Sequence, residues 1–222
     1  MSPKTSLVTG ANRGIGLELC RILKARGDHV IAVCRTASAE LKALGVQIEQ
    51  DVDVSSAAPL IALGKRLKDT KIDTLIANAG VLRGEELGKL DFESISYQLE
   101  VNALGPLRTV EAFLKSLHEG SKVALITSRM GSIGDNSSGG YYGYRMSKAA
   151  LNAAGMSLAH DLKPKGVAVV TLHPGFVKTE MTGKHGQLEP SESAKMLLAR
   201  IDALTLKSTG KFLHANGEEL PW

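Results

Sequence analysis

"TSLVTGANRGIG" (residues 5–16) joins a short apolar segment to a glycine-rich turn. The apolar segment has the length of a buried strand, and Gly10, Gly14 and Gly16 follow it where a helical pattern begins. Glycine permits a tight turn and lets a phosphate approach the backbone, while the amino terminus of a helix offers unpaired N–H groups and positive potential. The stretch therefore predicts a strand–loop–helix unit that binds a dinucleotide, with a purely structural turn as the alternative.

The same alternation of apolar strands and helical segments continues along the rest of the chain. Continuously apolar strands are typical of a parallel sheet that helices cover on both faces. No linker, repeat or low-complexity stretch interrupts the pattern, so the sequence predicts a single α/β domain over 1–222: a Rossmann-like, doubly wound parallel sheet of about seven strands. We expect strands at 5–10, 29–34, 46–52, 73–80, 122–128, 167–175 and 210–217, and helices at 16–28, 56–68, 91–118, 144–164 and 191–204.

The composition is that of an ordinary globular protein, with 43% hydrophobic and 23% charged residues. A net charge of +4 without a long basic run favours a small anionic ligand over a nucleic acid. Cys20 and Cys34 have neither metal-binding nor disulfide spacing, which indicates free thiols in a reducing compartment. No apolar run reaches the ~20 residues of a membrane span, and the strand pattern beginning at Thr5 leaves no room for a signal peptide. We therefore expect a cytoplasmic protein without a metal site.

"YRMSK" (144–148) places Tyr144 and Lys148 four residues apart, on one face of a helix. A free tyrosine has a pKa of ~10. A nearby ammonium group stabilises the phenolate and lowers that pKa, which would make the phenol a better general acid near neutral pH. Tyr141 is followed at the same spacing by Arg145 and Tyr142 by a methionine, so Tyr144 is the favoured candidate. A solvated surface pair is the alternative interpretation.

Six motifs occur in a fixed order along the chain. They are the T-G-x-x-x-G-x-G turn (9–16), "ANAG" (77–80), Asn102 in "LEVNALGP", Ser128 at a strand end, "YRMSK" and "HPGFVKT" (173–179). Together they resemble the short-chain dehydrogenase/reductase family, and the terminal "GKFLHANGEELPW" resembles its C-factor and sniffer-type carbonyl reductase branch. The resemblance covers essentially the whole chain. It implies an oxidoreductase that transfers hydride between a nicotinamide cofactor and a carbonyl (ketone, aldehyde or quinone) or alcohol.

The resemblance also implies a role for each residue of a catalytic tetrad. Tyr144 would donate a proton to the carbonyl oxygen, and Ser128 would hydrogen-bond that oxygen. Lys148 would tune Tyr144 and hold the cofactor ribose, while Asn102 would hold a water that links Lys148 to solvent. Ser132 is the competing serine, but only Ser128 directly follows the apolar strand.

The second strand ends in Cys34-Arg35, without the acid that would bind the ribose 2′-hydroxyl of NAD. Arg35 and Arg13 suit the 2′-phosphate of NADP, so we expect NADP(H) rather than NAD(H), although two exposed loop arginines would look the same. The resemblance assigns Asp51 and Val52 to the adenine, with a cap or turn as the alternative for Asp51. The predicted cofactor site comprises Gly10, Asn12, Arg13, Gly14, Ile15, Gly16, Arg35, Asp51, Val52, Asn78, Ala79, Gly80, Tyr144, Lys148, Pro174, Gly175, Val177 and Thr179.

Only about fifteen residues separate "HPG" from the last helix, which predicts an open pocket of low selectivity. The candidate lining residues are Tyr141, Tyr142, Phe176 and Met181, and His173 is expected to be structural. A protein that binds NADP(H) for signalling, with little or no turnover, is the second functional hypothesis, because of the C-factor resemblance.

The helices at 91–118 and 144–164 are apolar around most of their circumference. A helix of this kind must be buried on more than one side. We therefore expect a homodimer or homotetramer that pairs these helices. A monomer in which alanine serves only helix propensity is the alternative.

Overall fold

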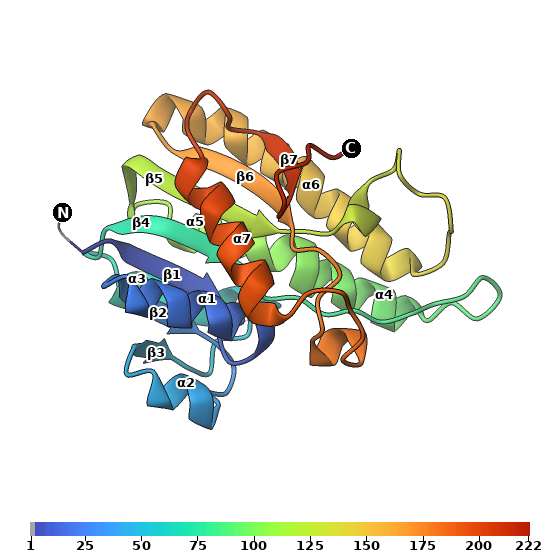
Figure 1. Ribbon diagram of the computed structural model, residues 1–222, viewed down its shortest axis with the longest axis horizontal. Helices are drawn as coiled ribbons and strands as arrows, with labels where there is room; N and C mark the ends of the chain where they lie inside the picture. Colours follow the sequence, from blue (N-terminus) through green and yellow to red (C-terminus); the bar gives the residue numbers. More distant parts are fainter. Residues whose placement is uncertain (1–2) are drawn as a thin grey trace.

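The computed structural model describes residues 3–222 and has the predicted architecture, a seven-stranded, wholly parallel sheet with helices on both faces (Figure 1). The strand order is β3-β2-β1-β4-β5-β6-β7, so the order along the chain reverses between β1 and β4. The strands are β1 (Thr5–Thr9), β2 (His29–Val33), β3 (Gln47–Glu49), β4 (Ile72–Ala77), β5 (Leu117–Ile126), β6 (Ala168–His173) and β7 (Lys211–His214).

Two hydrophobic cores lie on opposite faces of this sheet. Figure 1 shows α1 and α7 crossing one face, while α3, α5 and α6 cover the other and α4 packs against α6. The helices are α1 (Gly14–Ala25), α2 (Ala39–Ala43), α3 (Ala57–Arg66), α4 (Phe92–Leu99), α5 (Gly105–Ala112), α6 (Tyr142–Leu162) and α7 (Pro190–Ala203).

Successive residues of each strand point to opposite faces, which explains why the strands are apolar throughout. Leu7 pairs with Ile31 and Leu75, and all three belong to the core under α3, α5 and α6. The next residue, Val8, pairs with Ala32 and belongs to the core under α1 and α7. A strand with a polar residue at every second position could not serve both cores.

The predicted helix at 91–118 is wrong in its continuity and its end. α4 passes through a π-helical turn, Glu100–Leu104, into α5, which ends at Ala112, and β5 then begins at Leu117 rather than 122. Pro106 accounts for the interruption, because proline has no N–H to donate to the Asn102 carbonyl and its ring would clash with that carbonyl in a regular α-helix. Widening the turn relieves the clash.

Helix α2, which has only five residues, was not predicted. The Ser38 side chain caps this helix by accepting the N–H of Leu41 at 3.1 Å, and Leu41 is fully buried. A segment with one buried apolar residue and one capping residue is too short to show a helical periodicity of hydrophobic residues in the sequence.

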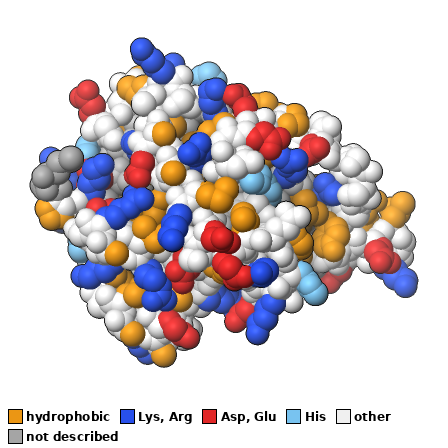
Figure 2. Space-filling model, viewed as in Figure 1, with side chains coloured by type: hydrophobic (Ala, Val, Ile, Leu, Met, Phe, Trp, Pro, Cys, Tyr) orange, Lys and Arg blue, Asp and Glu red, His pale blue; other side chains and the backbone are white. Residues whose placement is uncertain are grey.

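None of the helices formed by residues 3–222 is both long enough and apolar enough to cross a membrane. Figure 2 shows positive and negative side chains interspersed over the visible face, without a continuous basic stripe. Two loops project from the body of the molecule, after β4 and after β5 (Figure 1), and each exposes a large apolar side chain, Leu87 and Ile133.

Candidate active site

A cavity of about 550 Å³ opens at the carboxyl ends of the strands, where the chain order reverses between β1 and β4. A ligand of an open α/β sheet is expected at this place. Fifteen of the predicted site residues line it: Gly10, Asn12, Arg13, Gly14, Ile15, Gly16, Arg35, Val52, Asn78, Ala79, Gly80, Tyr144, Lys148, Pro174 and Thr179.

The glycine loop needs its glycines for two different reasons. Gly10 and Gly14 adopt left-handed conformations, with φ of 67° and 55°. Gly16 lies in α1, where an added Cβ would stand 2.2 Å from the Gly10 carbonyl oxygen and 2.6 Å from Asn78 Nδ2. The loop therefore folds tightly onto the end of β4 and leaves the first turn of α1 open to the cavity.

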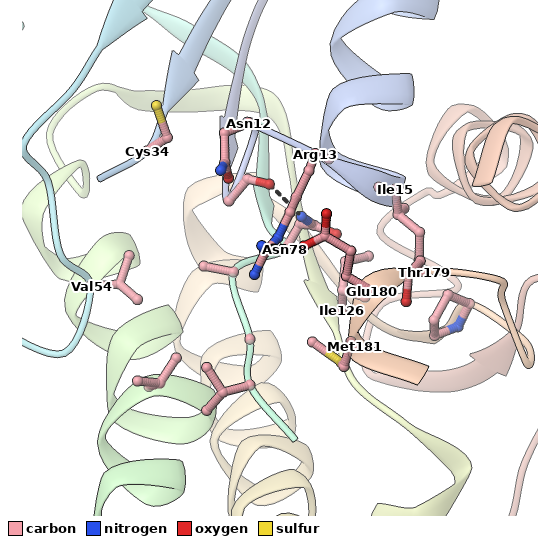
Figure 3. A pocket seen from close by; sticks show the side chains of 18 of the residues that line it. Asn12, Arg13, Ile15, Cys34, Val54, Asn78, Ile126, Thr179, Glu180 and Met181 are labelled. Carbon is pink, nitrogen blue, oxygen red and sulfur yellow. Dashed lines mark hydrogen bonds and ion pairs between the residues drawn. The ribbon is translucent and has the colours of Figure 1, made fainter. Parts of the chain in front are cut away.

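Asn78 joins the ends of β1 and β4. Its Nδ2 donates to the backbone carbonyls of Thr9 at 3.1 Å and Gly10 at 3.3 Å. In return the Thr9 hydroxyl accepts the backbone N–H groups of Asn78 and Ala79, both at 3.1 Å. These bonds fix the floor of the cavity between the two loops (Figure 3).

Tyr144 lies in the first turn of α6 and is only 7% exposed. Burial raises the pKa of its phenol to about 12, and a hydrogen bond with the Ser128 side chain opposes part of that rise. The prediction that Lys148 lowers this pKa is wrong in this structure. The Lys148 ammonium lies over the ring, 5.8 Å from its centroid, and does not offset the rise that burial causes in the pKa. The phenol is therefore protonated at neutral pH.

Lys148 is buried one turn further along α6 and donates to the backbone carbonyl of Ile126, at the end of β5, at 2.9 Å. Burial lowers the pKa of this ammonium to about 8. Gly131 allows the close packing here, because a Cβ would stand 2.7 Å from the carbonyl carbon of Lys148. The loop after β5 and α6 thus hold the lysine tightly at the cavity wall.

The structure distinguishes the two candidate serines. Of the two, Ser128 is the one that affects the pKa of Tyr144, and its hydroxyl accepts the N–H of Met130 at 3.2 Å. The Ser132 hydroxyl instead accepts the N–H of Asp135 at 3.1 Å and donates to the carbonyl of Trp222 at 3.2 Å, so it organises the loop after β5. Ser128 is therefore the better candidate of the two, and its hydrogen bond to a substrate oxygen stays a prediction.

Asn102 is fully buried in the π-helical turn and braces the loop after β4. Its Oδ1 accepts the N–H of Val81 at 2.8 Å, and its Nδ2 donates to the Val81 carbonyl at 2.8 Å and to Ser147 Oγ at 3.0 Å. Ser147 in turn donates to the Tyr144 carbonyl at 2.8 Å. Both amide hydrogens of Asn102 are therefore engaged, and its part in a water link stays a prediction.

Arg13 and Arg35 approach the cavity from the loops after β1 and β2. In Figure 3 the Arg13 side chain meets that of Glu180, from the segment after β6, and the two form an ion pair. Their side chains are 64% and 63% exposed, so the pair contributes little stability and can open to admit another anion. Arg35 is an exposed residue of the wall beside Cys34.

Five predicted residues do not line the cavity: Asn102, Ser128, Asp51, Gly175 and Val177. Asn102 is bound to Val81, in the loop after β4, and to Ser147. Asp51 is exposed in a left-handed conformation with φ of 62°, and its N–H donates to the Arg35 carbonyl at 3.0 Å. Asp53, two residues further on, lines the cavity instead.

Several lining residues were missed: Cys34, Asp53, Val54, Val81, Tyr97, Val101, Ile126, Thr127, Lys178, Glu180, Lys184, Glu189 and Pro190. Met181, which was predicted to line the substrate pocket, also lines this cavity. The segment from Glu180 to Pro190 lies beyond the last motif, and only its return over the strand ends brings it to the cavity. Val54 and Val101 could have been suspected as apolar residues just beyond predicted site positions.

Of the four residues expected around the substrate, Met181 lines the cavity, whereas Tyr141, Tyr142 and Phe176 do not. Tyr141, Phe176 and Met181 are 43%, 52% and 42% exposed. His173 is instead packed edge-on against His214, with ring centroids 4.9 Å apart, and burial lowers its pKa to about 3. A neutral, packed ring agrees with the structural role that was predicted for His173.

The comparisons with known proteins agree with this geometry. A family model described as short chain dehydrogenase matches residues 4–189. The chain is 46% identical to 1-hydroxy-2-glutathionyl-2-methyl-3-butene dehydrogenase of Rhodococcus sp. (strain AD45), over 98% of this chain and 99% of that protein. It is 45% identical to the C-signal protein of Myxococcus xanthus, over 68% of this chain and 93% of that protein.

A solved structure has the same fold over its full length. It is an NADPH-bound carbonyl reductase from chicken fatty liver, with a TM-score of 0.90, 30% identity and 100% coverage of both chains. The sequence motifs, the family match and this structural likeness agree on one assignment. The chain belongs to the short-chain dehydrogenase family of oxidoreductases.

Proposed function

We propose that this protein is an NADP(H)-dependent reductase of carbonyl compounds, with Tyr144 as the general acid. The observation that carries the proposal is the buried Tyr144 phenol beside Ser128, at the wall of a cavity whose other end is the glycine loop. A phenol that is protonated at neutral pH can give up a proton to a developing alkoxide. The NADPH-bound carbonyl reductase that shares the fold supports the choice of substrate and cofactor.

The residues around the cavity fit a dinucleotide. The φ angles of Gly10 and Gly14, and the lack of room for a side chain at Gly16, keep backbone and helix N–H groups accessible to a pyrophosphate. Arg35 supplies a cation for a 2′-phosphate, and Arg13 supplies a second one when its ion pair with Glu180 opens. When bound, the nicotinamide supplies a hydride for the carbonyl carbon.

Each residue of the tetrad then has a defined task. Ser128 and Tyr144 hydrogen-bond the carbonyl oxygen, and Tyr144 transfers its proton there as negative charge develops. Lys148 provides positive charge one helical turn away. Since the side-chain amide hydrogens of Asn102 are engaged and Pro106 cannot bond its backbone carbonyl, that carbonyl is the group suited to hold the predicted water.

A signalling protein that binds NADP(H) with little turnover is the second candidate, supported by the 45% identity to C-signal. Such a protein needs the glycine loop but not a buried Tyr144 beside Ser128 and Lys148. Measured turnover that depends on Tyr144 separates the two functions.

The direct test mixes the purified protein with NADPH and a panel of ketones, aldehydes and quinones, and follows absorbance of the reduced nicotinamide. The panel should include an aldehyde that carries a glutathionyl group, because the Rhodococcus relative is named for a glutathionyl alcohol. We expect oxidation of NADPH with at least one member. Binding of NADPH without oxidation by any of them would favour the second candidate.

The cofactor preference rests on Arg35 and can be tested with Arg35→Asp. The carboxylate would repel the 2′-phosphate and accept a hydrogen bond from a free 2′-hydroxyl. We expect NADPH affinity to fall by at least about tenfold, because a charge-assisted bond is replaced by repulsion, while NADH affinity rises. Fluorescence titration with both cofactors measures this.

Lys65→Asp is the matched control, since Lys65 is an exposed residue of α3 outside the cavity and the change in net charge is the same. It should bind both cofactors as the parent does. An Arg35→Asp protein with unchanged NADPH affinity would refute the assignment of Arg35 to the phosphate.

We further propose a homo-oligomer that pairs α6 and its neighbours. On α6, Met146, Ala150 and Ala153 form an exposed stripe of mostly small side chains. Leu104 and Leu107, on and after the π-helical turn that packs against α6, are 40% and 39% exposed. Small side chains allow two helices to approach closely across a two-fold axis.

Light scattering at micromolar concentration should therefore give at least twice the single-chain mass of 23.5 kDa. Ala153→Glu should reduce that mass toward 23.5 kDa, because it places two charges against each other at the proposed axis. Ala62→Glu, on the exposed face of α3, serves as the control. A parent protein of single-chain mass would contradict the proposal.

A further inference from the structure

The loop between β4 and α4 projects from the molecule (Figure 1), yet one of its charged residues is buried. Leu87 near the tip is 78% exposed, whereas Glu85 is 6% exposed. Carboxylates are rarely buried, because the charge loses hydration, unless hydrogen-bond donors replace the lost water. The surroundings of Glu85 should therefore contain such donors.

Both carboxylate oxygens of Glu85 are hydrogen-bonded, and the donors come from two helices. Oε1 accepts from Gln98 Nε2 at 2.6 Å and from Ser94 Oγ at 3.4 Å, both on α4. Oε2 accepts the backbone N–H of Gly143 at 3.1 Å, in the first turn of α6. The Glu85 backbone carbonyl also accepts the N–H of Tyr141 at 3.1 Å.

The helix that carries Tyr144 has no cap of its own. Tyr141 stands at the N-cap position in a left-handed conformation, with φ of 51°, and its side chain makes no capping hydrogen bond. The Gly143 N–H is one of the unpaired groups that a capping side chain normally accepts. Glu85 provides this cap from a different loop, and its negative charge suits the positive end of the helix.

The backbone of α6 at Gly143 packs tightly against the side chains of Glu85 and Gln98. A Cβ at Gly143 would stand 2.6 Å from Gln98 Nε2 and 3.0 Å from Glu85 Oε1, so the backbone of α6 lies directly against this pair. Gln98 is itself fixed, because its Oε1 accepts the N–H of Arg83 at 2.9 Å. The network thus sets the position of the residue that immediately precedes Tyr144.

We propose that Glu85 is a positioning residue for Tyr144. Through Gly143 it fixes the first turn of α6, and through Gln98 it ties that turn to α4. Glu85 does not line the cavity. Its effect on catalysis is therefore indirect. This inference rests on the proposed function in one respect, that Tyr144 is the proton donor.

Glu85→Gln is the first test. The new amide can still accept the Gly143 N–H, but its NH₂ group then faces the NH₂ group of Gln98, and two donors cannot bond each other. We expect kcat to fall by about tenfold, as for a slightly misplaced catalytic group. KM for NADPH and for the carbonyl should stay within about twofold, because binding groups are untouched.

The double variant Glu85→Gln/Gln98→Glu again gives a matching donor or acceptor to Gly143, to Arg83 and to the contact between positions 85 and 98. The amide introduced at position 85 would accept the N–H of Gly143 and donate to the carboxylate introduced at position 98, whose other oxygen would accept the N–H of Arg83. Net charge is that of the parent, so recovery of kcat to within about threefold would separate positioning from simple damage to the fold. Glu86→Gln, on the exposed neighbour, is the control and should behave as the parent.

Hydrogen exchange gives a readout that does not need turnover. Amides at 142–146 should exchange at least about fivefold faster in Glu85→Gln, because the first turn of α6 opens more often. They should return to the parent rate in the double variant. If the parent reduces no carbonyl, the proposed function fails, and the exchange rates alone still decide the role of Glu85.

Three results would overturn the proposal. They are an unchanged kcat in Glu85→Gln, a double variant as slow as the single one, and unchanged exchange at 142–146. Melting temperatures of all variants show whether global unfolding accounts for a loss.

Discussion

Replacing Tyr144 by Phe should lower kcat for carbonyl reduction by at least about 10²-fold, the lower end of the loss expected for a general acid. The ring stays in place and only the hydroxyl is removed, so NADPH binding should be retained. Because the pKa of Tyr144 is about 12, its phenol is neutral below pH 10 in both the folded and the unfolded protein. The unfolding free energy should therefore fall only by the value of one hydrogen bond, about 1 kcal/mol.

Stopped-flow or steady-state assays with NADPH and the best carbonyl of the panel measure this effect, and fluorescence titration confirms cofactor binding. Tyr141→Phe and Tyr142→Phe test the competing phenols. Tyr141 is 43% exposed, and the spacing to a lysine belongs to Tyr144 alone. Full activity in Tyr144→Phe, or a comparable loss in either of the other two, would move the proton donor elsewhere.

The sequence was sufficient to predict the parallel sheet, because strands buried on both faces have continuously apolar sequences. It also located the glycine loop, since Gly10, Gly14 and Gly16 are needed for reasons of backbone conformation and space. These features depend on residues that are close together in the chain. Local signals of this kind can be read without knowing the tertiary structure.

Features that depend on contacts between distant segments could not be predicted. The pKa of Tyr144 was assigned the wrong direction, because a Tyr–Lys spacing shows a nearby charge but not the depth of burial. The lining residues Lys184, Glu189 and Pro190 were missed for the same reason, as was the pairing of Glu85 with Gly143 across 58 residues. The π-helical turn was locally encoded by Pro106, but a single proline also fits a simple helix end.

Lys148→Met should abolish most activity and yet stabilise the fold. Turnover should fall by at least about 10²-fold, as for the loss of a preorganised charge at a catalytic centre. The ammonium has a pKa of 10.5 when free and about 8 in the folded protein, so folding disfavours its charged form. Each pKa unit corresponds to about 1.4 kcal/mol, so burial of the charge lowers the unfolding free energy by about 3 kcal/mol below pH 8.

Methionine removes that cost and fills similar space, but it loses the hydrogen bond to the Ile126 carbonyl, worth about 1 kcal/mol. We therefore expect a net gain of about 1–2 kcal/mol in unfolding free energy at pH 7. Urea unfolding of the parent and the variant measures it. Lys165→Met, which changes an exposed lysine beyond the end of α6, controls for the loss of a charge and should leave stability nearly unchanged.

The pH dependence of that gain identifies its cause. Between pH 8 and pH 10.5 the unfolded parent holds a proton on Lys148 that the folded parent has lost, so parent stability rises with pH in this window. The advantage of Lys148→Met should thus be constant below pH 8 and shrink toward pH 10.5. If the variant is instead less stable at every pH, the buried ammonium is not under strain. A stable, inactive Lys148→Met protein would mean that the charge is retained for catalysis at a cost to folding.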